Sequence, residues 1–125
     1  MQTTQLPTTQ LGQTGLEITR VGFGAWAIGQ MTRERIAQLP EDDWRRDHEA
    51  FREPQLSERL ALVERLRAVA DRRGASPGAV AIAWTLRNPA VDGAIVGFRA
   101  AEQVDAVLQA ATLELTDKDV IDVEG

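Results

Sequence analysis

Hydrophobic residues recur at helical spacing in the second half of the chain. Between residues 56 and 73 the apolar positions form one stripe, and charged residues cover the other faces. Arg72 and Arg73 suit the negative end of a helix, and Gly74 suits the left-handed residue that closes one. The pattern predicts an amphipathic helix over 56–73, with both arginines as surface charges. The stripe consists of Leu56, Leu60, Val63, Leu66, Val69 and Ala70.

A second helix is predicted over residues 77–87. Ser76 is a favoured capping residue, and Pro77 is favoured in a first helical turn. From Ala79 to Leu86 the segment is apolar on nearly every side. It is therefore expected to be buried on more than one face, with Trp84 in the core.

A strand, a turn and a helix are predicted between residues 92 and 111. Ala94 to Val96 is a short apolar run, typical of a buried strand, and Gly97 closes it. Apolar residues then recur at helical spacing up to Ala111. Free backbone N–H groups at the start of such a helix favour a phosphate. Arg99 lies in the turn, where a guanidinium binds phosphate through two parallel hydrogen bonds. The alternative is a structural turn without a ligand.

The N-terminal third is predicted to be β-structure. Two short β-prone runs, 8–11 and 16–20, flank Gly12-Gln13-Thr14-Gly15, and glycines at both ends of that loop suit a hairpin. A third strand follows over Val21 to Ala25. Because side chains alternate along a strand, Gly22 and Gly24 leave one of its faces bare.

The remaining segments contain weaker signals. Thr32 is a favoured cap for a short helix that Pro40 ends. Residues 41–54 mix charges of both signs around Trp44 and predict an irregular loop or a frayed helix, with Trp44 as a core residue. Thr116 and Asp119 have the spacing of a capping box, which predicts a last helical turn.

Composition limits the function classes. The chain has 125 residues, which suits one domain, and 43% of them are hydrophobic. Its formal net charge of −5 argues against binding nucleic acid or an anionic membrane surface. There is no cysteine, so disulfides and thiolate chemistry are excluded. The first residues lack the layout of a signal peptide, and no apolar run is long enough to span a bilayer. We expect a single-domain cytoplasmic protein.

Two stretches of the chain resemble the aldo-keto reductase family. The first runs from Leu11 to Gly29 and is similar to the N-terminal hairpin and first barrel strand of that family; it contains Val21-Gly22-Phe23-Gly24-Ala25-Trp26. The second runs from Met31 to Leu115 and is similar to the part that follows the seventh strand; it contains Ile95-Val96-Gly97-Phe98-Arg99. Together the two stretches cover nearly the whole chain.

The resemblance implies an α/β fold that is a partial (β/α)8 TIM barrel, largely helical with few strands. Residues 1–29 would form the hairpin and first strand, residues 30–55 an irregular loop, and residues 56–125 the helical pair and the last strand–helix unit. A complete barrel takes about 250 residues. The family has six further strands between the positions of Gly29 and Met31. Since the first and last strands are neighbours in a closed barrel, the two that remain are expected to pair in parallel.

The missing strands are those that contain the catalytic group of the family, an Asp, a Tyr, a Lys and usually a His. This chain has no tyrosine to donate a proton to a carbonyl. Its one lysine is Lys118 in an acidic tail, and its one histidine is His48 in a polar loop that matches no catalytic strand. We therefore assign no catalytic residue and expect no carbonyl reduction by this chain alone.

The resemblance also implies part of an NADP(H) site. Val107 replaces an Asn that often contacts adenine in the family, and Ala100-Ala101 supplies no capping side chain. Because the other cofactor-binding strands are missing, we expect weak binding of NADP(H), and we predict no metal site. The positions beside the nicotinamide ribose match Gly24, Ala25 and Trp26, the last with packing as the alternative role. Those around the adenosine 2′-phosphate match Gly97, Phe98, Arg99, Glu102 and Gln103.

A two-stranded parallel ribbon leaves both sheet edges open, and open edges invite pairing with another chain. We therefore expect self-association, a protein partner or partial disorder of the N-terminal third. An alternative function is a non-enzymatic interaction module that uses the helical pair of 56–87. A less favoured one is an enzyme repurposed for cyclisation or isomerisation. Its residues would be Asp42, Asp43, His48 and Glu49; the simpler interpretation makes His48 a solvated loop residue and Asp42-Asp43 an exposed charge cluster.

Overall fold

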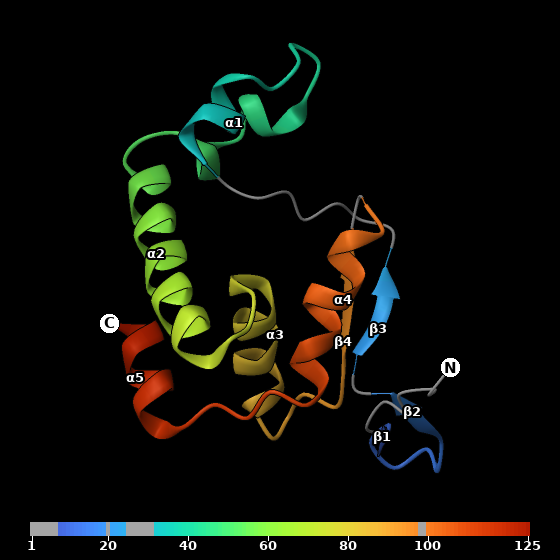
Figure 1. The fold of residues 1–125 in the computed structure, drawn as a ribbon. Helices are drawn as coiled ribbons and strands as arrows, with labels where there is room; N and C mark the ends of the chain where they lie inside the picture. The colour runs from blue at the N-terminus through green and yellow to red at the C-terminus, as the bar shows by residue number, and fades with distance from the viewer. Residues whose placement is uncertain (1–7, 20, 25–31, 98–99) are drawn as a thin grey trace.

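The computed structural model describes residues 8–19, 21–24, 32–97 and 100–125 (Figure 1). Helices make up most of the described chain, and its strands are short. In chain order the elements are β1 (Thr8–Gln10), β2 (Glu17–Thr19), β3 (Val21–Gly24), α1 (Arg33–Ala37), η1 (Trp44–Arg46), η2 (Glu49–Phe51), α2 (Gln55–Arg73), α3 (Pro77–Arg87), β4 (Ala94–Gly97), α4 (Glu102–Leu108), η3 (Gln109–Ala111) and α5 (Asp117–Glu124), where η denotes a 3₁₀ helix.

The N-terminal hairpin forms as the glycine loop predicts. β1 and β2 pair antiparallel, with Thr8 opposite Thr19. Gly12 and Gly15 have φ angles of +52° and +74°, a region that side-chain-bearing residues rarely adopt. The backbone N–H of Gly12 donates to Oδ2 of Asp92 at 2.9 Å, which ties the hairpin to the loop before β4.

β3 and β4 pair in parallel, which confirms the prediction that these two strands are neighbours. In register, Val21 lies beside Ala94, Gly22 beside Ile95, Phe23 beside Val96 and Gly24 beside Gly97. Each of the two sheets in the described residues has two strands. The hairpin lies at the amino ends of β3 and β4, below the ribbon in Figure 1.

The long helices begin and end at the predicted signals. Ser76 accepts a hydrogen bond from the backbone N–H of Ala79 at the start of α3, and Gly74 closes α2 with φ of +62°. Thr116 and Asp119 form a complete capping box on α5, which runs further than the predicted single turn. α4 is shorter than predicted, because its last turn tightens into η3.

Residues 32–54 contain α1, the predicted short helix, and two 3₁₀ turns, η1 and η2, in place of the predicted irregular loop or frayed helix. Thr32 accepts from the N–H of Arg35, as predicted, and α1 ends at Ala37, before Pro40. Arg33 then bonds to Glu53 and, at 2.8 Å, to the hydroxyl of Ser57. These contacts hold α1 at the N-terminal end of α2, away from α5 (Figure 1).

The core is small and built from small side chains. One cluster joins α3, β4 and η3 through Ala79, Leu86 and Val96, and a second joins α2, α3 and α5 through Val69, Val80 and Val123. Leu113 packs against both. Trp44 and Trp84 are exposed, and Phe51 is only partly buried. Such a core contributes less apolar burial than one filled with large residues.

Three burial predictions are wrong. Trp44 and Trp84, predicted to be core residues, are both exposed. Trp84 is 42% exposed on α3, and its indole N–H donates to Oε1 of Glu124, the last residue of α5, at 3.0 Å. The strand β4 is not buried on both faces, because Ile95 is 82% exposed while Val96 is buried.

Candidate functional site

The structure brings together part of the predicted NADP(H) site, which is called the nucleotide corner below. Gly24 and Gly97 lie side by side at the carboxyl ends of the parallel strands, and α4 begins a few residues later at Glu102 (Figure 1). Carboxyl ends of parallel strands are where ligands bind in α/β folds. Ala25, Trp26, Phe98 and Arg99, four of the predicted site residues, lie outside the described residues.

The start of α4 offers little to an anion by its own chemistry. Ala101 provides no capping side chain, as predicted. The N–H groups of Gln103 and Val104 are not free for a ligand, because they donate to the carbonyls of Ala100 and Ala101 at 3.1 and 3.0 Å. Glu102 and Asp105 place two carboxylates in the first turn. That negative charge repels a phosphate, so tight phosphate binding here would require a positively charged group.

His48 is exposed, as the interpretation of a solvated loop residue predicts. The imidazole packs edge-on against Trp44 and Phe51, with ring centroids 5.4 and 6.2 Å apart, and remains exposed. Asp43 was predicted to be an exposed charge, and that is wrong. It accepts the N–H of Arg45 at 3.0 Å as the cap of η1 and is largely buried against the Arg45 guanidinium. Its contacts are structural.

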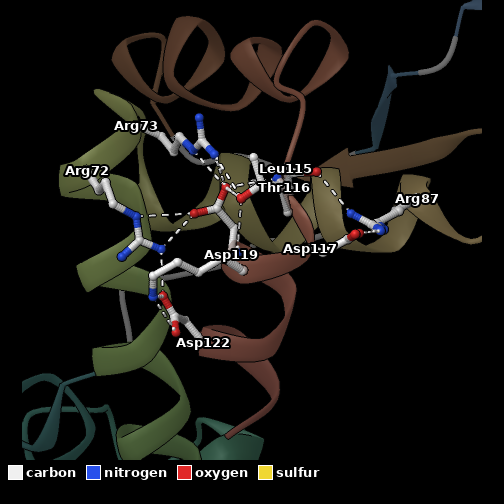
Figure 2. Close-up of polar contacts among 9 residues, drawn as sticks. Arg72, Arg73, Arg87, Leu115, Thr116, Asp117, Asp119 and Asp122 are labelled. Carbon is white, nitrogen blue, oxygen red and sulfur yellow. Dashed lines mark hydrogen bonds and ion pairs between the residues drawn. The ribbon is translucent and has the colours of Figure 1, made fainter.

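The strongest electrostatic feature is a buried carboxylate on α5 (Figure 2). Asp119 is 1% exposed. One of its oxygens accepts from Arg72 Nη2 at 2.7 Å, and the other accepts from Arg73 Nε at 2.7 Å and from the N–H of Thr116 at 2.9 Å. The capping box was predictable, but the two arginines lie 46 and 47 residues away in sequence. Arg72 and Arg73 were predicted to be surface charges, but both also hydrogen-bond to this buried carboxylate.

These contacts set the ionisation of Asp119. Burial by itself raises the pKa of a carboxyl, but the hydrogen bonds from Arg73, Arg72 and Thr116 outweigh it. The pKa of Asp119 is consequently held well below its ordinary value. Nearby Asp122 has its pKa lowered too, first by Lys118 and then by Arg72.

Acid is expected to remove the stabilisation that Asp119 provides. Because its folded pKa lies below the unfolded value of about 3.9, the contribution is complete above about pH 4 and is lost as pH falls further. Unfolding by urea, followed at pH 7, 5, 4 and 3, should show the difference between wild type and Asp119→Ala steady at first and shrinking below pH 4. A difference unchanged down to pH 3 would contradict this assignment.

A groove of about 580 Å³ lies at the other end of β4. Leu86 and Arg87 at the end of α3 line one side, and Ala110 to Leu115 line the other. Arg87 reaches across to the carbonyl of Leu115 at 2.9 Å and to the carboxylate of Asp117 (Figure 2). Since α4 runs back from the Gly97 end, the groove does not coincide with the candidate nucleotide corner.

Other candidate chemistry is sparse in the part of the chain that the structure describes. There, no group of three or more potential ligands is arranged to hold a metal ion, and no helix is both long and apolar enough to cross a membrane. Lys118, the one lysine, pairs with Asp122 at 2.9 Å on the surface of α5.

A sequence model described as the aldo/keto reductase family matches residues 17–125, which is most of the chain. The match includes β3, β4 and all the helices.

Proposed function

The chain belongs to the aldo/keto reductase family, and from this premise we propose that it is a shortened member that keeps a weak NADP(H)-binding corner without carbonyl reductase activity of its own. Its ancestry is that of an oxidoreductase. The fold of the family is a (β/α)8 barrel, and the few strands and many helices described here are compatible with part of one.

The observation that carries the proposal is the parallel pairing of β3 with β4. Strands from opposite ends of the chain lie next to each other, as the first and last strands of a closed barrel do, and Gly24 lies beside Gly97. These two glycines match family positions near the two ends of the cofactor. The pairing supports a corner that keeps the arrangement of the parent barrel.

Weak affinity follows from the groups that surround the corner. The first turn of α4 has two carboxylates and no capping side chain. Arg99 is then the main source of positive charge toward a 2′-phosphate, by the family resemblance. Most groups that hold the rest of the cofactor belong to strands this chain lacks. The absence of tyrosine removes the proton donor that the family uses in carbonyl reduction.

Titration of NADPH fluorescence with the purified chain tests this proposal. Wild type is expected to bind NADPH weakly, with a dissociation constant of roughly 0.1–1 mM, and to bind NADH less well, because NADH lacks the 2′-phosphate. Arg99→Ala should lower NADPH affinity to the NADH level, a loss on the order of tenfold. The matched control is Arg67→Ala, since Arg67 is exposed on α2 and pairs with Glu64 on the same helix.

Two results would overturn the proposal. One is no NADPH binding at millimolar cofactor by a folded chain. The other is reduction of an aldehyde by the purified chain with NADPH, because that would require a proton donor we do not assign.

A second candidate function is protein binding. It is favoured by the β3–β4 ribbon, because no third strand in the described chain pairs with either strand. Parallel strands are normally covered inside larger sheets. A non-enzymatic interaction module or homo-oligomer would provide that cover.

A further inference from the structure

Ser76 makes a second hydrogen bond besides the one that caps α3. Its hydroxyl oxygen accepts from the backbone N–H of Ala79 at 3.0 Å, and the hydroxyl donates to the carbonyl oxygen of Ala106 at 2.8 Å. Ala106 lies within α4, 30 residues further along the chain. A hydroxyl has one donor and two acceptor lone pairs, so one side chain can make both bonds at once. Ser76 therefore joins the start of α3 to α4.

α4 has little else that fixes its position. It is a helix of seven residues, none of them fully buried, and Ala101 gives it no side-chain cap. Val107 and Leu108 are partly buried against the cluster that contains Ala79. Apolar contacts are non-directional and allow a helix to slide along its axis, whereas a hydrogen bond has a preferred distance and angle. The bond from Ser76 thus restricts the axial position of α4.

The axial position of α4 decides the geometry of the nucleotide corner. α3 and α4 lie side by side (Figure 1). Glu102 precedes Ala106 by four residues, about 6 Å along the helix axis, and Gln103 follows Glu102. Gly97, on the other side of the corner, ends β4, which Val96 anchors in the core cluster. Because β4 and α4 are held separately, the placement of the start of α4 relative to Gly97 depends on the contacts of α4 with α3.

We propose that Ser76 is a positioning residue of the nucleotide corner. By donating to Ala106 it sets where α4 lies along α3, and so where Glu102 and Gln103 lie relative to Gly97. The inference rests on the proposed NADP(H) binding, and the role is indirect because Ser76 acts through α4. The approach of the two helices is close at this point: a Cβ atom on Gly78 would lie 3.9 Å from both Ser76 Oγ and Val107 Cγ1.

Three substitutions separate the two bonds of Ser76. Ser76→Thr retains a hydroxyl and should retain both bonds. Ser76→Asp retains an acceptor for the N–H of Ala79, since Asp is a favoured helix cap, but an ionised carboxylate cannot donate to the carbonyl of Ala106. Ser76→Ala loses both bonds. If Ser76 served only as the cap of α3, the aspartate variant would bind NADPH as wild type does.

Chemical-shift titration with NADPH measures the affinity of each variant. The dissociation constant should rise about three- to tenfold in Ser76→Asp and in Ser76→Ala, the range expected for loss of one hydrogen bond. Ser76→Thr should keep the wild-type value. Thr116→Ala is the matched control, because it removes the cap of α5 instead and should leave the NADPH dissociation constant unchanged. Wild-type affinity in Ser76→Asp, or an equal loss in Thr116→Ala, would overturn the inference.

Amide hydrogen exchange on the ligand-free chain tests the positioning without any nucleotide. In Ser76→Asp the N–H groups of α4 should exchange about three- to tenfold faster, while that of Ala79 stays as protected as in wild type. Unchanged exchange in α4 would overturn the inference whatever the affinity of the wild type. A wild type that binds no NADPH contradicts the proposed function instead, and hydrogen exchange then still decides whether Ser76 holds α4.

Discussion

Asp119→Ala is expected to lower the free energy of unfolding by about 2–4 kcal/mol at neutral pH. Asp119 is buried, and Arg72 and Arg73 from α2 converge on it together with Thr116. Alanine removes these charge-assisted hydrogen bonds and half of the α5 capping box. The cost is below that of fully buried pairs, because both arginines are partly exposed and can be hydrated again. Urea unfolding followed by circular dichroism measures the change.

The matched control is Asp122→Ala on the same helix. Asp122 also pairs with Arg72, but it is more exposed than Asp119 and takes no part in the capping box. Asp122→Ala should therefore lower the free energy of unfolding much less than Asp119→Ala does, as is usual for ion pairs at the surface. Equal losses in the two variants would show that α5 is held by general charge attraction rather than by the geometry around Asp119.

Leu86→Ala is expected to lower the free energy of unfolding by about 2–4 kcal/mol. Leu86 is 6% exposed in the cluster that joins α3 to Val96 of β4 and to Ala110 and Ala111. The other buried members of the cluster are alanines and Val96, which are too short to fill the space that the lost atoms leave. That space is therefore expected to stay open and to widen the groove that Leu86 lines. Thermal and urea unfolding, at one protein concentration, give the measurement.

Leu62→Ala is the control, with the same atoms removed from a residue that is 39% exposed on α2. Its expected cost is below about 1 kcal/mol. A Leu86→Ala loss as small as that would mean that β4 does not depend on this cluster. Because the same cluster positions the strand that ends at Gly97, Leu86→Ala should also weaken NADPH binding.

Local signals in the sequence determined most of the secondary structure. The glycine loop of the hairpin, the Ser76-Pro77 start of α3, the Gly74 end of α2 and the Thr116–Asp119 capping box all formed as predicted. Each depends on hydrogen bonds or φ angles within about four residues, so a short window of sequence contains the necessary information. The parallel pairing of β3 and β4 was predictable only through the family resemblance, because local sequence does not specify a partner strand.

The sequence predicted Gly24, Gly97 and Glu102 as site residues and Ala101 as a start without a capping side chain. The structure places Gly24 beside Gly97 and Glu102 at the start of α4, where Ala101 provides no cap. The sequence did not show that the N–H groups of Gln103 and Val104 are bonded within the turn. That depends on the backbone path between Ala100 and Val104, which only coordinates describe.

Long-range contacts were decided by the tertiary structure alone. Asp119 meets Arg72 and Arg73 because α5 packs along the end of α2, and no local pattern marks a carboxylate for a guanidinium almost fifty residues away. The exposure of Trp84 and Ile95 has the same origin. A hydrophobic side chain is stabilised by burial. Whether it is buried depends on whether the fold places another element over it. Ile95 is 82% exposed, although its neighbour Val96 on the same strand is buried.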